Sequence, residues 1–120
     1  MTVIVFRIPT PPSVNNLFAN VAGRGRVRSA RYGAWSNAAA WAMKTEGGRA
    51  RTWALIETPV EVEIGLGAIR GDIDNRAKGC LDLLVKMAVI KDDSLVHKLI
   101  LERGPGNPKE AIVTVREIAA

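Results

Sequence analysis

Cysteine, histidine and long apolar runs are scarce in this chain of 120 residues, and these scarcities limit the kinds of protein that it can be. The single cysteine, Cys80, excludes an internal disulfide framework and a cysteine-rich zinc site. The only histidine, His97, lies within an expected strand without an obvious catalytic partner, so a structural role is favoured over a proton shuttle. Because the N-terminus carries no long apolar run, we expect neither a signal peptide nor a membrane span, and a cytoplasmic location follows by default.

The bulk composition is that of an ordinary globular protein. Hydrophobic residues make up 48% and charged residues 24% of the chain, which argues against disorder. The length predicts one domain over residues 1–120, and no internal repeat is visible. The 17 lysines and arginines exceed the 12 aspartates and glutamates, which gives a formal charge of +5. This excess favours an acidic partner, with nucleic acid as the first candidate.

The spacing of apolar residues predicts an α+β fold. Strands are expected at 2–8, 59–67, 95–103 and 111–118, helices at 29–46 and 75–88, and loops at 13–20 and 23–28. Alternation is clearest in the second strand, where Val60, Val62, Ile64 and Leu66 share one face. The order strand, helix, strand, helix, strand, strand indicates helices packed on a mixed sheet.

Capping residues and glycines predict the limits of the first helix. Ser29 is the expected N-cap, and the glycine pair after residue 46 is the expected end. Trp35, Ala38, Ala39 and Ala42 fall at the spacing of a core-facing stripe.

Two groups of aspartates are the most unusual feature of this basic chain. Asp72 and Asp74 precede Lys78, and the pair Asp92 and Asp93 follows the second expected helix. Like charges about 4 Å apart repel by about 4 kcal/mol at an effective dielectric near 20. A site that gathers such charges usually holds a cation, and oxygen ligands suit a hard ion such as Mg²⁺.

The spacing of these residues predicts a shared position at a strand-to-helix junction. Asp72 and Asp74 are two residues apart, so in an extended segment their side chains point to the same side. Asp74 occupies the expected N-cap of the second helix, where the helix dipole favours a carboxylate. Lys78 lies four residues further on, in the first helical turn. Whether the Asp92–Asp93 turn returns to Asp72 depends on tertiary packing.

Phosphodiester hydrolysis is the chemistry that needs this set of residues. Bound Mg²⁺ polarises a phosphoryl oxygen and lowers the pKa of an attacking water, while Lys78 supplies a point charge to the phosphate. The plainer alternative is a capping aspartate, surface ion pairs and a solvated Asp92–Asp93 turn. The combination of the lysine with both acidic groups favours the functional interpretation.

The same residues resemble a known family, the RusA-type Holliday-junction resolvases. The resemblance rests on the run from Gly71 to Lys78, the Leu81–Asp82 step, the Asp92–Asp93 pair before a strand, and Pro11–Pro12–Ser13 followed by Asn15–Asn16. It covers nearly the whole chain. It implies a small homodimeric endonuclease, active with Mg²⁺ or Mn²⁺, that nicks two opposing strands of a four-way DNA junction. Such an enzyme acts in recombination and repair and is bacterial or phage-encoded, with no membrane partner and no small-molecule cofactor.

The resemblance also implies roles for individual residues. Asp72, Asp74 and Asp93 would be the metal-binding carboxylates, and Lys78 would be catalytic or contact the phosphate. Asp92 would be a supporting acid and Asn75 an orienting group. The implied DNA contacts are Arg24, Arg26, Arg28, Arg70, Lys78 and Arg103. Gly71 stands where some members carry an arginine, and Arg70 is the neighbouring candidate for that role.

Several residues have plainer interpretations. Cys80 is expected to be a small buried hydrophobe. Asp82 is interpreted as a helix-surface partner of Lys78 or Lys86. The three tryptophans are expected in the core or in a dimer contact rather than stacked on bases.

Two other functions compete with junction resolution. One is a less selective metal nuclease acting on flaps or duplex DNA. The other is a non-catalytic, basic DNA-binding dimer whose acidic groups are structural.

Overall fold

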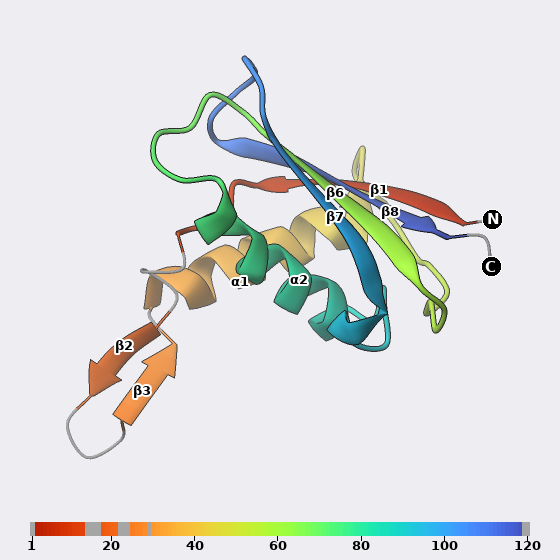
Figure 1. Cartoon of the computed structure of the whole chain (residues 1–120), viewed down its shortest axis with the longest axis horizontal. Coiled ribbons are helices and arrows are strands. Elements are labelled where there is room, and N and C mark those ends of the chain that lie inside the picture. The colour runs from red at the N-terminus through yellow and green to blue at the C-terminus, as the bar shows by residue number, and fades with distance from the viewer. Residues whose placement is uncertain (1, 14–17, 22–24, 29, 119–120) are drawn as a thin grey trace.

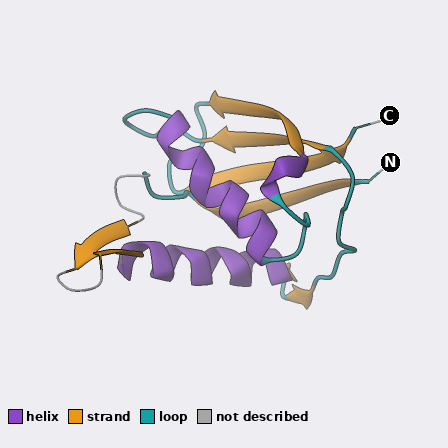
Figure 2. Cartoon of the chain, turned by 60° about the horizontal axis from the view of Figure 1, so that its bottom comes forward, coloured by secondary structure: helices purple, strands orange, loops and turns teal. Residues whose placement is uncertain are grey.

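The computed structural model describes residues 2–13, 18–21, 25–28 and 30–118, with backbone alone for 18–21 and 25–28 (Figure 1). A four-stranded sheet consists of β1 (Val3–Pro9), β8 (Glu110–Glu117), β6 (Val60–Leu66) and β7 (Val96–Arg103), in that order. Neighbouring strands are antiparallel except β6 and β7, which are parallel. Helices α1 (Ala30–Lys44) and α2 (Ala77–Lys86) both lie on one face of this sheet (Figure 2). The predicted α+β fold with a mixed sheet is confirmed.

Alternating side chains of β6 place the core between the sheet and the helices. Val60, Val62, Ile64 and Leu66 are all buried, with at most 3% of their surface exposed, as their spacing predicts. The neighbouring strands bury matching side chains on the same face, namely Ile4, Phe6, Ile8, Ala111, Val113 and Val115. Burial of this apolar surface is the main stabilising term of the fold.

The opposite face of the sheet is partly covered by charged side chains. Arg116 Nη1 donates to Glu61 Oε2 at 2.8 Å and to Glu63 Oε1 at 3.0 Å. Lys98 Nζ lies 3.4 Å from the other oxygen of Glu61. The hydrogen bond from Arg116 holds the pKa of Glu61 below its usual value. This face therefore meets solvent through paired charges, as one side of an antiparallel sheet commonly does.

The buried stripe of α1 differs in part from the predicted one. Trp35 and Ala39 are buried as expected, but Ala38 is exposed. The helix instead buries Tyr32 and Met43, whose larger side chains remove more apolar surface from water than Ala38 would. Ser29, the predicted N-cap, lies outside the described residues.

Helix α2 is shorter than predicted at both ends. A separate 3-10 turn, η2 (Asp74–Arg76), precedes it, and the capping residue is Arg76 with no side-chain cap. The prediction that Asp74 caps the helix is therefore wrong, because the chain winds one tighter turn before the α-helix begins. At the other end, Ala88 adopts a left-handed φ of 55° and Val89 N donates to the carbonyl of Leu84, which closes the helix in a Schellman arrangement.

Two short hairpins replace segments predicted as loops, predicted as the end of a helix, or left unassigned. Strands β2 (Phe18–Val21) and β3 (Gly25–Arg28) pair antiparallel, so the loop predictions at 13–20 and 23–28 are wrong over the paired residues. Pairing between strands is a non-local interaction that residue types in a single segment do not reveal. This hairpin projects away from the sheet (Figure 1). Helix α1 ends at Lys44, two residues earlier than predicted. Strands β4 (Thr45–Glu46) and β5 (Arg49–Ala50) pair around the Gly47–Gly48 turn, so these glycines close a hairpin and not the helix.

Within the described ranges, no helix is long and apolar enough to cross a membrane.

Candidate active site

The loop between β6 and α2 exposes the first two predicted carboxylates. Asp72 and Asp74 are both exposed, and neither carboxylate has a hydrogen-bond or ion-pair partner among the described residues. Gly71 adopts a φ of +86°, a conformation that suits glycine and strains other residues. The turn at Gly71 thus presents both carboxylates to solvent on one short loop.

Two arginines hold the backbone of this loop. Arg103, at the end of β7, donates from Nη2 to the carbonyl of Gly71. Arg76 donates from Nη1 to the carbonyl of Pro11 at 2.8 Å and from Nη2 to the carbonyl of Arg70 at 3.5 Å. The loop is therefore tied to the sheet and to the N-terminal proline segment, while its acidic side chains point outward.

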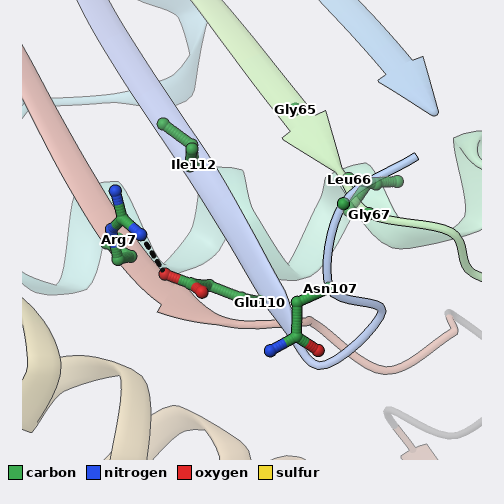
Figure 3. Close-up of a pocket in the computed structure, with 8 residues that line it drawn as sticks. Arg7, Gly65, Leu66, Gly67, Asn107, Glu110 and Ile112 are labelled. Atoms are coloured by element: carbon green, nitrogen blue, oxygen red, sulfur yellow. Dashed lines mark ion pairs between the residues drawn. The ribbon is translucent and has the colours of Figure 1, made fainter. Parts of the chain in front are cut away.

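The start of the loop is fixed by close contact with the turn between β7 and β8. A Cβ at Gly67 would lie 2.0 Å from the carbonyl oxygen of Asn107, so only glycine fits there. Gly67 and Asn107 also border a pocket of about 310 Å³ on the open face of the sheet (Figure 3). The charged side chains in this pocket are Arg7 and Glu110, paired at 2.9 Å. The pocket contains none of the predicted site residues.

The second acidic pair lies in a turn after α2. Asp92 accepts a hydrogen bond from the backbone N–H of Ser94 at 3.0 Å and caps the 3-10 turn η3 (Asp93–Leu95). Hydrogen bonding by Ser94 holds the pKa of Asp92 below its usual value. Asp92 therefore shapes the turn that contains Asp93.

The two acidic groups lie at opposite ends of α2. Asp92 and Asp93 border a surface pocket of about 370 Å³ together with Asp82 and the last turn of the helix. Asp74 precedes the helix, whose 10 residues at a rise of 1.5 Å each span roughly 15 Å. In the described part of the chain, no three acidic, histidine or cysteine side chains gather closely enough to hold a metal ion.

Lys78 lies between the two acidic groups. It projects from the first turn of α2 with 55% of its side chain exposed, and its Nζ is 3.8 Å from Asp82 Oδ2. The predicted helix-surface pair of Asp82 is therefore confirmed. Asn75 is partly buried in η2, between the exposed Asp74 and the helix.

The predicted DNA-contacting arginines have different settings. Arg24 lies outside the described residues, and Arg26 and Arg28 lie on β3, where only the backbone is described. Arg70 is exposed beside the acidic loop. Arg103 is exposed as well, but one of its nitrogens is committed to Gly71.

Cys80 is excluded as a nucleophile. The side chain is 1% exposed, and burial raises the pKa of its thiol to about 12, so the thiol stays protonated near neutral pH. Its prediction as a buried hydrophobe is confirmed.

The other residues weighed as functional have structural or surface positions. Trp35 is buried and Trp53 is partly buried, as predicted, but Trp41 is 71% exposed. His97 is exposed on β7.

Arg76 is the residue of this region that sequence reasoning did not single out. Its only signal is its place inside the run from Asp72 to Lys78, where an arginine looks like one more surface charge. Its contact with Pro11 joins positions 65 residues apart and becomes visible only in the folded chain.

Comparison with protein families identifies the family of this chain. The family model described as Endodeoxyribonuclease RusA matches residues 9–116, which includes both acidic groups and Lys78. The chain therefore belongs to the RusA family of endodeoxyribonucleases, enzymes that act on Holliday junctions. No curated protein sequence matches it significantly.

Proposed function

We propose that this protein resolves four-way DNA junctions as a homodimer, by paired symmetric nicks that depend on Mg²⁺, with Mn²⁺ as a substitute. The observation that carries the proposal is the loop at the start of α2. Its two exposed carboxylates have no partner among the described residues, and they precede an exposed lysine in the first turn of the helix. The 120 residues would act as a single endonuclease domain.

The carboxylates of the loop fit the needs of Mg²⁺. This ion commonly takes one or two protein carboxylates and keeps its other positions for water and phosphate oxygens. Asp72 and Asp74 can supply that number. When bound, the ion would polarise the scissile phosphate and activate the attacking water.

Other side chains would position the DNA strand. Lys78 would place its charge beside the phosphate that reacts, and its pairing with Asp82 keeps the ammonium close to the helix. Arg70 and the arginines of the β3 hairpin would contact neighbouring phosphates, and Arg103 would add its remaining donors. Such contacts fix the register of the strand without selecting a sequence.

Dimerisation would explain how Asp93 takes part. Because Asp93 and the Asp72–Asp74 loop lie at opposite ends of α2, we propose that Asp93 of each chain completes the acidic site of the second copy. A two-fold dimer then carries two complete sites, one for each opposing strand of the junction. It also doubles the formal charge of +5 to +10, which favours binding to a branched polyanion.

Cleavage of a labelled synthetic four-way junction tests the proposal, with a linear duplex of matched sequence beside it. We expect nicks on two opposing strands of the junction in Mg²⁺, none after chelation by EDTA, and none in the duplex. Tight junction binding without nicks in Mg²⁺ or Mn²⁺ would favour the non-catalytic binding dimer. Equal cleavage of junction, flap and duplex would favour the less selective nuclease.

A further inference from the structure

Arg76 occupies an unusual position for an arginine in an acidic loop. Its side chain does not pair with a carboxylate among the described residues but donates to two backbone carbonyls, those of Pro11 and Arg70. Its Nε is buried without a hydrogen-bond partner in the described part of the chain. Burying part of a guanidinium in this way costs free energy, which the two hydrogen bonds to backbone carbonyls must offset.

The segment that accepts the stronger of these hydrogen bonds is anchored on several sides. Thr10 N donates to the carbonyl of Lys109 at 3.0 Å, and Trp35 Nε1 donates to the carbonyl of Pro9 at 2.9 Å. Pro11 and Pro12 are buried, and their rings restrict the backbone φ. Arg76 thus connects the acidic loop to a rigid part of the core.

From these contacts we infer that Arg76 is a positioning residue, which holds the Asp72–Asp74 loop in its reactive geometry by linking Arg70 to the Pro11 carbonyl. The inference rests on the proposed function of that loop. A guanidinium suits this task because its planar, forked donors can serve two carbonyl oxygens at once. A lysine ammonium carries the same charge but is a single point donor on a flexible stem.

The link has a defined consequence for catalysis. Asp72 and Asp74 repel each other, and their loop contains a left-handed glycine, so nothing in their own residue types keeps both carboxylates in one place. Loss of Arg76 should therefore leave the fold and the DNA contacts outside the loop in place but loosen the loop. Substitution of a residue that supports metal ligands in this way commonly lowers metal affinity or activity by about 10- to 100-fold.

The test compares Arg76→Met, which keeps the apolar stem and removes the donors, with Arg7→Met. Arg7 pairs with Glu110 on the open face of the sheet and serves as the matched control. Amide hydrogen exchange of residues 70–76 should accelerate by about tenfold or more in Arg76→Met alone. Single-turnover nicking of the junction should fall by about 10- to 100-fold, with unchanged junction binding and a higher half-saturating Mg²⁺ concentration.

Either of two outcomes would overturn the inference: unchanged exchange in residues 70–76, or wild-type nicking by a variant whose loop exchange has accelerated. If Arg76→Met does not fold, Arg76→Lys replaces it and should show both effects to a smaller extent, and wild-type values for both would again overturn the inference. If the wild-type chain does not nick junctions, the proposed function fails, while the exchange measurement still decides whether Arg76 holds the loop.

Discussion

The two acidic regions at the ends of α2 contain the same residue type in opposite settings. In the turn after the helix, a carboxylate oxygen of Asp92 accepts a hydrogen bond from the backbone N–H of Ser94, and this bond shapes the turn. In the loop before the helix, the carboxylates of Asp72 and Asp74 have no partner among the described residues, and arginines hold the backbone instead. An aspartate that caps a turn has a local structural explanation. The exposed pair before the helix has none, and this difference supports the proposal that the loop is the reactive region.

The largest effect is expected from removing a charge in the loop. Asp72→Asn and Asp74→Asn should each lower junction nicking by on the order of 10³-fold, because an amide is a poor ligand for a hard cation. Junction binding should stay at wild-type strength or tighten, since a negative charge near phosphate is lost. A filter-binding assay and a nicking assay on the same samples measure both quantities.

Glu57→Gln is the matched control for these substitutions. Glu57 is an exposed carboxylate paired with Lys91, and it precedes β6, whereas the loop follows that strand. It should nick at the wild-type rate. Retention of full nicking by Asp72→Asn, or unfolding of that variant, would contradict the catalytic assignment of the loop.

A smaller loss is expected at Lys78, which lies between the two regions. Lys78→Met should lower the single-turnover rate by about 10²-fold, because a positive charge beside the reacting phosphate is removed. It also releases Asp82 from its ion pair. Lys91→Met, which removes an exposed lysine paired with Glu57, is the control and should leave the rate unchanged. Equal rates for both variants would show that Lys78 is an ordinary surface charge.

The smallest effect is expected at Asp92. Its lowered pKa means that the capping hydrogen bond stabilises the turn above the ordinary aspartate pKa and is lost as the pH falls through the lower, folded-state pKa. Asp92→Ala should therefore lower the melting temperature slightly at pH 7, and the difference should shrink below pH 3.8. Thermal unfolding over a pH series measures it. A difference that persists unchanged at low pH would mean that the carboxylate is not the stabilising group.

The residue pattern predicts some elements of the fold and not others. The alternation from Val60 to Leu66 predicts β6 and its buried face correctly. The position of α2 follows from its apolar stripe, but its start does not, because the tighter turn at Asp74 depends on packing. The hairpin of β2 and β3 was missed, since pairing between short strands is not encoded in either one alone.

The separation of the two acidic regions follows from strand direction. Because β6 and β7 are parallel, the loop that enters α2 and the turn that leaves it must lie at opposite ends of the sheet. Residue spacing gives no strand direction, so spacing alone could not decide whether Asp93 returns to Asp72. The contact between Arg76 and Pro11 joins positions 65 residues apart, so residue spacing does not predict it either.

Mixing two inactive variants tests the central claim that both acidic regions serve one catalytic site across two chains. Asp72→Asn and Asp93→Asn should each be inactive alone. A mixed dimer should contain one complete site, formed by the Asp72–Asp74 loop of one chain and Asp93 of the other. In co-expressed protein with random pairing, nicking should return to about a quarter of the wild-type capacity, with one strand cut per junction. A mixture that forms dimers, binds junctions and remains inactive would contradict the claim.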